Sequence, residues 1–183
     1  MTVVPAGGEA GVETVILALG SNLGDRRAHM ERGLDFLSRE VRIVAVSRLV
    51  ESAPYGPVRQ PDFLNLVARG ETSLAPLELL DVTERAEAHC GRERTIPMGP
   101  RTLDVDIVFH GAARMAHPRL TLPHPRWQDR PFVSDLAADV GEGLVDPVSG
   151  RVLRPPGPLG SLHADLREVP PLSFFPEPPG ARP

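Results

Sequence analysis

The sequence predicts an α+β protein with one domain, built on a mainly antiparallel sheet with helices on one face. Three observations support this prediction: apolar runs of strand length, helical periodicity between some of them, and Gly- or Pro-containing turns at their ends. The chain has 183 residues, which is long enough to bury one proper core. We expect the domain to span residues 13–146, with a flexible tail at 1–12 and a Pro/Gly-rich tail at 147–183.

The beginning of the domain is expected to form a strand, a turn and a helix. Residues 14–19 are a continuous apolar run that stops at the polar turn 20–25, where Asn22 or Asp25 could cap a helix. Apolar and small residues then recur at helical spacing: Met30, Gly33, Leu34 and Leu37. A helix to about Ser38 is therefore predicted.

The middle of the domain is expected to add two strands and a second helix. Residues 41–50 alternate polar and apolar side chains, and a Pro/Gly-rich loop separates them from a third strand at 63–72. Pro76 suits a first helical turn, and Gly91 suits a helix end. One face of this helix carries Leu79, Val82, Ala86 and Cys90.

A fourth strand at about 104–109 and a short helix at about 132–138 complete the domain. The resulting order is strand, helix, strand, strand, helix, strand, with a small C-terminal extension. This βαββαβ order is typical of a ferredoxin-like sandwich. The fold by itself predicts no function.

Two carboxylates, Asp104 and Asp106, stand among aliphatic residues in the fourth strand. Residues two apart on a strand share a face, so both carboxylates would point to one spot, where a hard cation such as Mg²⁺ would relieve their repulsion. An ordinary half-solvated strand shows the same alternation. Arg101 and the turn at Gly99 and Pro100 immediately upstream favour a functional site over that alternative.

Composition narrows the range of partners. The net charge is −4 and the pI is about 5.9, which argues against a nucleic-acid binder held by bulk electrostatics. All twenty basic residues are Arg, whose planar guanidinium suits bidentate contact with phosphate. The single cysteine, Cys90, is expected in the core. We find no signal peptide or membrane span in the sequence and expect a cytoplasmic protein.

A second candidate pair is Phe63 and Asn65, which share one face of the third strand. An aromatic ring beside an amide could stack on a flat heterocycle and hydrogen-bond its edge. The residues alone favour a core Phe with a satisfied Asn, and the binding interpretation remains open at this point.

Five collinear blocks of sequence resemble the 6-hydroxymethyl-7,8-dihydropterin pyrophosphokinases, enzymes of folate synthesis. They span roughly residues 15–138 and consist of Leu19 to Asp25, Ser52 to Gly56 with Gln60 to Asn65, Gly91-Arg92, Gly99 to Ile107, and Leu122-Pro123-His124. The resemblance implies a ferredoxin-like monomer that transfers pyrophosphate from ATP to the pterin hydroxyl and releases AMP. The implied partners are these small molecules, with no nucleic acid and no membrane.

The resemblance also implies roles for individual residues. Two Mg²⁺ ions would bind Asp104 and Asp106. The implied ATP-binding residues are Glu87, Arg92, Arg94, Arg101, His124 and Arg130. The implied pterin-binding residues are Ser52, Ala53, Tyr55, Phe63, Asn65 and Phe132. The implied catalytic residues are Arg92, Arg101, Asp104 and Asp106.

The sequence departs from the family pattern before the fourth strand. Relatives commonly carry a basic residue and a Trp in a mobile lid there, whereas this chain has Pro97 and Met98 in a loop about one residue shorter. Pro125 also follows His124 where many relatives have Tyr. The main alternative is therefore a degenerate relative that binds pterin and ATP but turns over weakly. A regulatory binding module or a metal-free, acylphosphatase-like hydrolase would not need the paired carboxylates.

Overall fold

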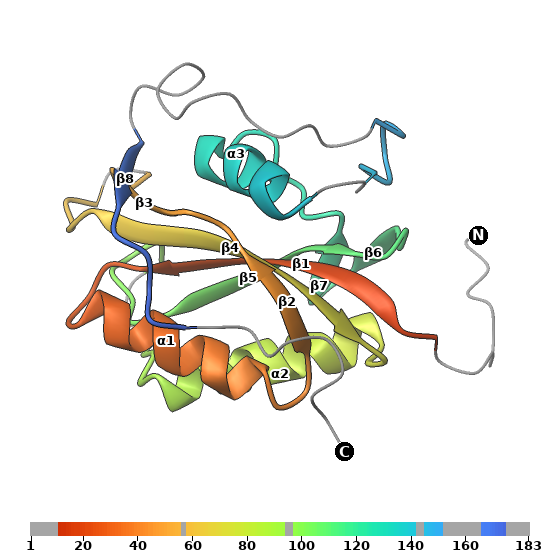
Figure 1. The fold of residues 1–183 in the computed structure, drawn as a ribbon, viewed down its shortest axis with the longest axis horizontal. Helices are drawn as coiled ribbons and strands as arrows, with labels where there is room; N and C mark the ends of the chain where they lie inside the picture. Colours follow the sequence, from red (N-terminus) through yellow and green to blue (C-terminus); the bar gives the residue numbers. More distant parts are fainter. Residues whose placement is uncertain (1–10, 56–57, 94–96, 142–144, 152–165, 175–183) are drawn as a thin grey trace.

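The computed structural model describes residues 11–55, 58–93, 97–141, 145–151 and 166–174. A sheet lies between two layers of helix in this part of the chain (Figure 1). The elements are β1 (Glu13–Ser21), α1 (Arg26–Leu37), β2 (Arg42–Val46), β3 (Leu49–Ser52), β4 (Phe63–Thr72), α2 (Pro76–His89), β5 (Asp104–His110), β6 (Met115–His117), β7 (Leu120–Leu122), α3 (Pro131–Val140) and β8 (Arg167–Val169). None of the helices in these ranges is long and apolar enough to cross a membrane.

The main sheet has the strand order β5-β1-β4-β3-β8, and β2 also pairs with β4. Every pairing is antiparallel, as the sequence predicts. The mixed α and β content and the mainly antiparallel sheet are confirmed. A separate ribbon of two strands, β6 and β7, follows β5.

The predicted strand at 41–50 is divided into β2 and β3. Ser47 interrupts it because the Ser47 hydroxyl accepts the Val67 N–H at 2.8 Å, in place of a backbone carbonyl. The next residue, Arg48, turns its guanidinium to Asp139 on α3, with N···O distances of 2.8 and 2.9 Å. Both fragments stay paired with β4, so the division bends the strand without removing it from the sheet.

The prediction that the helices lie on one face holds for α1 and α2 but not for α3. Figure 1 shows α1 and α2 on one side of the sheet and α3 on the other. The residues of β1 alternate between the two cores: Val15, Leu17 and Leu19 face α1 and α2, while Ile16 and Ala18 join α3. A continuous apolar run is typical of a strand covered on both faces, so the sequence carried this signal.

Helix α1 begins at its Asp25 cap, whose carboxylate accepts the Ala28 N–H at 3.1 Å. Of the two predicted caps, Asp25 is the one used. Gly33 on this helix lies against Leu103, since a Cβ at Gly33 would come within 2.6 Å of a Leu103 methyl carbon. Leu103 is fully buried and directly precedes Asp104, so α1 packs closely against the entry to β5.

Part of the predicted C-terminal tail belongs to the sheet. Strand β8 pairs with β3, with Arg167 opposite Glu51 and Val169 opposite Leu49. Val169 also packs against the core beneath α1, as do Leu172 and Phe174. Residues 167–169 therefore form an edge of the main sheet.

Candidate functional site

The register of the sheet brings the two candidate pairs together. Gly20 in β1 is paired with Asn65 on one side and with Asp104 on the other. Two residues earlier, Ala18 is paired with Asp106. Because β1 carries small residues at both positions, the side chains of the neighbouring strands face an open floor. A Cβ at Gly20 would lie 3.3 Å from the Asn65 side-chain oxygen.

A cavity of about 350 Å³ lies over this floor. Ten of the predicted site residues line it: Ser52, Ala53, Tyr55, Phe63, Asn65, Arg101, Asp104, Asp106, Arg130 and Phe132. The predictions from distant parts of the sequence therefore converge on one space. Arg94 lies outside the described residues, and Glu87, Arg92 and His124 are found behind the lining.

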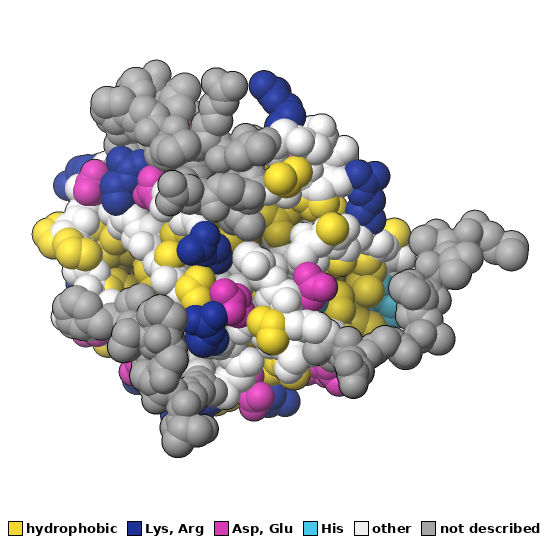
Figure 2. Space-filling model, turned by 45° about the vertical axis from the view of Figure 1, so that its right-hand side comes forward, with side chains coloured by type: hydrophobic (Ala, Val, Ile, Leu, Met, Phe, Trp, Pro, Cys, Tyr) yellow, Lys and Arg dark blue, Asp and Glu magenta, His cyan; other side chains and the backbone are white. Residues whose placement is uncertain are grey.

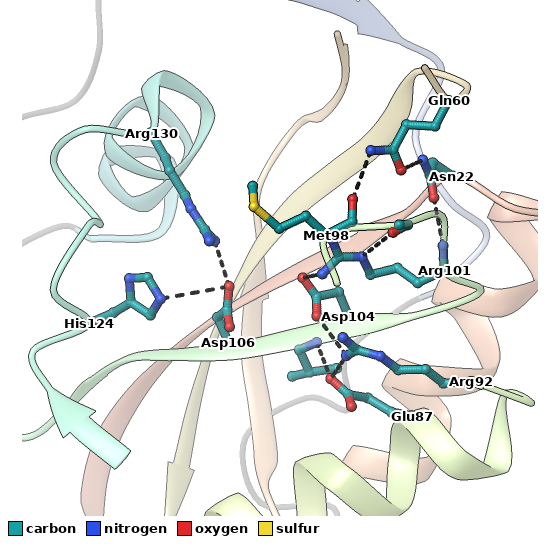
Figure 3. Close-up of polar contacts among 12 residues, drawn as sticks. Asn22, Gln60, Glu87, Arg92, Met98, Arg101, Asp104, Asp106, His124 and Arg130 are labelled. Atoms are coloured by element: carbon teal, nitrogen blue, oxygen red, sulfur yellow. Dashed lines mark hydrogen bonds and ion pairs between the residues drawn. The ribbon is translucent and has the colours of Figure 1, made fainter. Parts of the chain in front are cut away.

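The charged end of the cavity is organised around the two aspartates (Figure 3). Arg92 donates to one oxygen of Asp104 at 2.6 Å, and Arg101 donates to its other oxygen at 3.0 Å. Arg130 donates to Asp106 at 2.6 Å. Three guanidinium groups thus neutralise two carboxylates that would otherwise repel each other.

Glu87 supports this end from below. It is 5% exposed, accepts the Val105 N–H at 2.9 Å, and forms an ion pair with Arg92. Arg92 therefore lies between Glu87 and Asp104, as Figure 3 shows. This placement links α2 to β5 and orients the Arg92 guanidinium.

His124 lies beside Asp106, with 3.9 Å between its Nε2 and a carboxylate oxygen. Burial lowers the pKa of His124 below its usual range; Asp106 opposes the shift, whereas Arg130 and Arg126 add to it. The imidazole is therefore neutral at pH 7. A neutral ring can donate a hydrogen bond or accept one, whichever its tautomer allows.

The other end of the cavity is aromatic and amide-bearing. Asn65 is 3% exposed, and its amide donates to the Ser52 hydroxyl at 2.9 Å. Phe63 is half-buried, and the Arg101 guanidinium carbon lies 5.5 Å from the centre of its ring. Phe132 reaches the same cavity from α3. Phe63 and Asn65 thus both line the cavity, and the Asn65 amide is also satisfied by Ser52.

Asn22 is a site residue that the sequence reasoning considered only as a helix cap. It is 1% exposed and accepts the Arg101 N–H at 2.8 Å. Its amide donates to the Gln60 side chain and to the Pro61 carbonyl, both at 3.0 Å. Gln60 continues the network to the Met98 carbonyl at 2.9 Å. One side chain therefore joins three loops around the cavity.

Only indirect sequence signals pointed to this network. Asn22 ends an apolar strand, and Gln60 stands in one of the blocks that resemble the family, but their partners are 38 to 79 residues away in the sequence. Met98 lines the cavity in a backbone conformation with φ of 57° and is 48% exposed. Arg126 and Asp129 also line the cavity and were not predicted.

Trp127 and Cys90 are core residues. Trp127 is 8% exposed and packs edge-on against Phe109, with 5.0 Å between the ring centres. Cys90 is 3% exposed at the end of α2, as the sequence predicts. On the face drawn in Figure 2, the described arginine and acidic side chains are interspersed, without a broad area of one charge.

Asp104 and Asp106 provide the kind of oxygen donors that hard divalent cations prefer. Both line the cavity, and within the described part of the chain no group of three or more His, Cys, Asp and Glu side chains is close enough to hold a metal. The pair therefore fits a cation that takes its remaining ligands from a bound substrate or from water.

Comparison with known proteins identifies the family. The family model for 7,8-dihydro-6-hydroxymethylpterin-pyrophosphokinase matches residues 16–142. The chain is 46% identical over 135 residues to a 2-amino-4-hydroxy-6-hydroxymethyldihydropteridine pyrophosphokinase of Pseudomonas aeruginosa, covering 70% of this chain and 83% of that protein. It is 39% identical to the Haemophilus influenzae protein of the same name, covering 74% of this chain and 86% of the relative.

Larger proteins match over part of their length. The bifunctional protein FolKE of Lactococcus lactis is 40% identical over 67% of this chain, which spans 36% of that protein. A crystal structure of Plasmodium falciparum HPPK-DHPS is similar in fold, with a TM-score of 0.55 and 14% identity over 70% of this chain and 41% of that one. The residues matched by the family model, 16–142, include all those that line the main cavity. The chain belongs to the 7,8-dihydro-6-hydroxymethylpterin-pyrophosphokinase family.

Proposed function

We propose that the protein transfers the pyrophosphate group of ATP to the hydroxyl of 6-hydroxymethyl-7,8-dihydropterin and releases AMP. The observation that carries this proposal is the single cavity, which joins paired carboxylates and arginines to an aromatic and amide end. Bacterial relatives named as pyrophosphokinases, 39% and 46% identical, support the same reaction. A hydrolase or a binding module would not require this combination.

Asp104 and Asp106 would hold two Mg²⁺ ions. Bound there, Mg²⁺ would neutralise phosphate charge and polarise the phosphorus under attack. The carboxylates fit this role because both face the cavity and offer oxygen ligands, and their present partners are the guanidinium groups of three arginines. Arg92, Arg101 and Arg130 are thus already beside the place where a triphosphate would bind.

The three arginines would exchange their carboxylate partners for phosphate oxygens. Guanidinium groups bind both kinds of oxyanion with the same planar geometry. Arg92 would stay anchored by Glu87, so its reach toward the phosphates is restrained. Glu87 therefore contributes to nucleotide binding through Arg92. The neutral His124 ring beside Asp106 can add a hydrogen bond without adding charge.

The pterin would bind between Phe63 and Phe132, with its edge toward Asn65. Flat heterocycles gain binding energy by stacking on aromatic side chains, and a buried amide reads the donor and acceptor pattern of the edge. Ser52 fixes the Asn65 amide through the 2.9 Å hydrogen bond. Ala53 and Tyr55 would complete the wall.

The proposed reaction needs no protein nucleophile. The pterin hydroxyl oxygen attacks the β-phosphorus of ATP and loses its proton to water, the bond from that phosphorus to the α–β bridging oxygen breaks, and AMP leaves with that oxygen. The side chains contribute by positioning the two substrates and by neutralising charge as it moves to the leaving oxygen. Gln60 and Asn22 hold the loops that close around this space.

We propose a fold, domain bounds, an oligomeric state and a cellular location together with this reaction. We assign the fold as a ferredoxin-like sandwich whose second strand is divided into β2 and β3, and the strand order supports this assignment. Residues 13–146 would be the pyrophosphokinase domain, with tails at 1–12 and 147–183, of which the second adds β8 to the sheet. We expect a cytoplasmic monomer whose partners are its two substrates.

The direct test is AMP formation by the purified protein with ATP, Mg²⁺ and 6-hydroxymethyl-7,8-dihydropterin. Control reactions omit the pterin or contain excess chelator. AMP that requires both pterin and metal supports the proposal. Pterin and ATP binding without AMP would identify a degenerate relative, with the Pro97 and Met98 loop as the first place to restore. Absence of both binding and turnover would contradict the proposal.

A further inference from the structure

The segment 166–174, called here the C-terminal strap, lies against the outer edge of the sheet and beyond the residues that match the family. Strand β8 pairs with β3 along its outer edge, and the last residue of β3 is Ser52. After β8 the strap crosses α1, where Arg27 donates to the carbonyls of Pro170 and Pro171 at 2.8 and 3.2 Å. Figure 1 shows this blue segment crossing from β3 to α1.

A line of charged side chains connects the strap to the loop that carries the pterin residues. Arg167 forms an ion pair with Glu51, and the same carboxylate accepts from Arg26 at 2.7 Å. Arg26 donates further to the Asp62 carbonyl at 2.8 Å. Glu51 precedes Ser52 and Asp62 precedes Phe63, so this line joins both ends of the loop between β3 and β4.

The strap also faces the back of the proposed pterin wall. A second cavity, of about 490 Å³, is lined by Leu166 and Arg167 of the strap and by Glu51. Four of its other lining residues are shared with the main cavity: Ser52, Ala53, Tyr55 and Phe132 line both. These residues therefore separate the pterin space from the strap. A shift of the strap would be felt on the pterin side.

The exposure of the ion pair between Arg167 and Glu51 shows whether its loss should affect the position of the loop or the stability of the fold. Glu51 is 9% exposed and needs cationic partners, whereas the Arg167 side chain is 74% exposed. An ion pair with so exposed a partner contributes little to stability. Loss of the Arg167 charge would still change the positions of the Glu51 carboxylate and the Arg26 guanidinium. Its effect should therefore appear in the loop more than in the overall fold.

We propose that Arg167 is a positioning residue for the pterin end of the site, acting through Glu51 and Arg26. The C-terminal strap is then a working part of the enzyme, outside the family's shared domain. This inference rests on the proposed assignment of the pterin residues. In this proposal Arg167 acts through Glu51 and Arg26, and the strap itself does not touch a substrate.

The test compares Arg167→Ala, Arg167→Lys and a control, Arg119→Ala, in the full chain. Arg119 forms comparable exposed ion pairs with Asp81 and Glu84. We expect Arg167→Ala to raise KM and Kd for the pterin about tenfold, since small misplacements of binding groups weaken substrate positioning. The KM for ATP and kcat should stay within about twofold. Arg167→Lys should recover most of the pterin affinity, and Arg119→Ala should leave it unchanged.

A pterin KM that is unchanged in Arg167→Ala would overturn the inference, as would equal increases in the KM for both substrates. Phe63→Ala, measured in parallel, separates this failure from that of the proposed site. If Phe63→Ala weakens pterin binding and Arg167→Ala does not, only the role of the strap is wrong. If Phe63→Ala has no effect, the pterin assignment is wrong and the inference falls with it.

Discussion

The two ends of the cavity are built in opposite ways. At the charged end, Asp104 and Asp106 are held by guanidinium groups that a triphosphate and its metal would have to take over. At the aromatic end, Asn65 is fixed by Ser52 and by its register opposite Gly20 in the sheet. The charged end must exchange partners on binding, whereas the aromatic end is already formed.

This difference indicates how the free energy of binding is distributed. Exchange of one oxyanion for another leaves a small net gain at each arginine, because the old ion pair is lost as the new one forms. A preformed pocket loses little conformational freedom when a flat ligand enters it. We therefore expect substitutions at the charged end to affect turnover most and those at the aromatic end to affect pterin affinity most.

The largest expected effect is that of Asp104→Ala. Loss of this carboxylate removes a proposed metal ligand and releases Arg92 and Arg101 from their present partner, so kcat should fall by about a thousandfold or more. AMP release measures it, and the melting temperature checks the fold. The exposed Asp81→Ala on α2 is the control. Turnover within tenfold of the parent would contradict the assignment of Asp104 as a metal ligand.

Phe63→Ala should weaken pterin binding without changing ATP binding. Loss of one stacking surface is worth about 1–3 kcal/mol, or a rise in Kd of about fivefold to about a hundredfold. Titration calorimetry with each substrate measures the two affinities. Phe36→Ala is a matched control, because Phe36 packs against His89 on the helical layer. Equal losses for ATP and pterin would show that the two ends are not independent.

Asn22→Ala tests the network that joins the two ends. The substitution leaves the part-buried Arg101 N–H without its side-chain acceptor and removes one partner of Gln60, which should lower the free energy of unfolding by about 1–3 kcal/mol. Urea unfolding measures the loss. Both substrate affinities should weaken together, unlike the effect of Phe63→Ala. An unchanged unfolding midpoint would mean that the loops are held by other contacts.

The smallest expected effect is that of pH on the Cys90 thiol, which lies in the hydrophobic core shared by both ends of the cavity. Burial raises the pKa of the Cys90 thiol, with Arg32 opposing the shift. Because the folded pKa lies above the unfolded one, this contribution to stability is complete below the unfolded pKa and declines as pH rises toward the folded pKa. Thiol labelling near pH 8 should be slow in the folded protein and fast in denaturant. Fast labelling of the folded protein would indicate that the core opens locally.

The sequence predicted those parts of the site that depend on local periodicity. Asp104 and Asp106 share a face because their strand alternates, and Phe63 and Asn65 do so for the same reason. The resemblance to the family added the arginines. Ten of the residues that the sequence singled out line one cavity, and their roles in binding and catalysis stay predictions.

What the sequence reasoning missed depends on partners that are distant in the chain. Asn22 was considered as a helix cap, yet its side chain bonds to loops 38 to 79 residues away. The side of the sheet covered by α3 could have been inferred from the apolar run in β1, since a strand covered on one face would alternate. Strand β8 could not have been predicted, because three residues from a proline-rich tail acquire strand conformation by pairing with β3.

Gly33 shows how a residue outside the cavity is tied to the chemistry. Glycine inside a helix is less stable than alanine by about 1 kcal/mol, so replacement of Gly33 is an obvious choice for an engineer who wants a more heat-resistant protein. Here the added methyl would meet Leu103 at 2.6 Å, and Leu103 directly precedes Asp104. We therefore expect Gly33→Ala, although chosen to stabilise the helix, to lower activity. The added methyl would displace Leu103 and with it the Asp104 carboxylate.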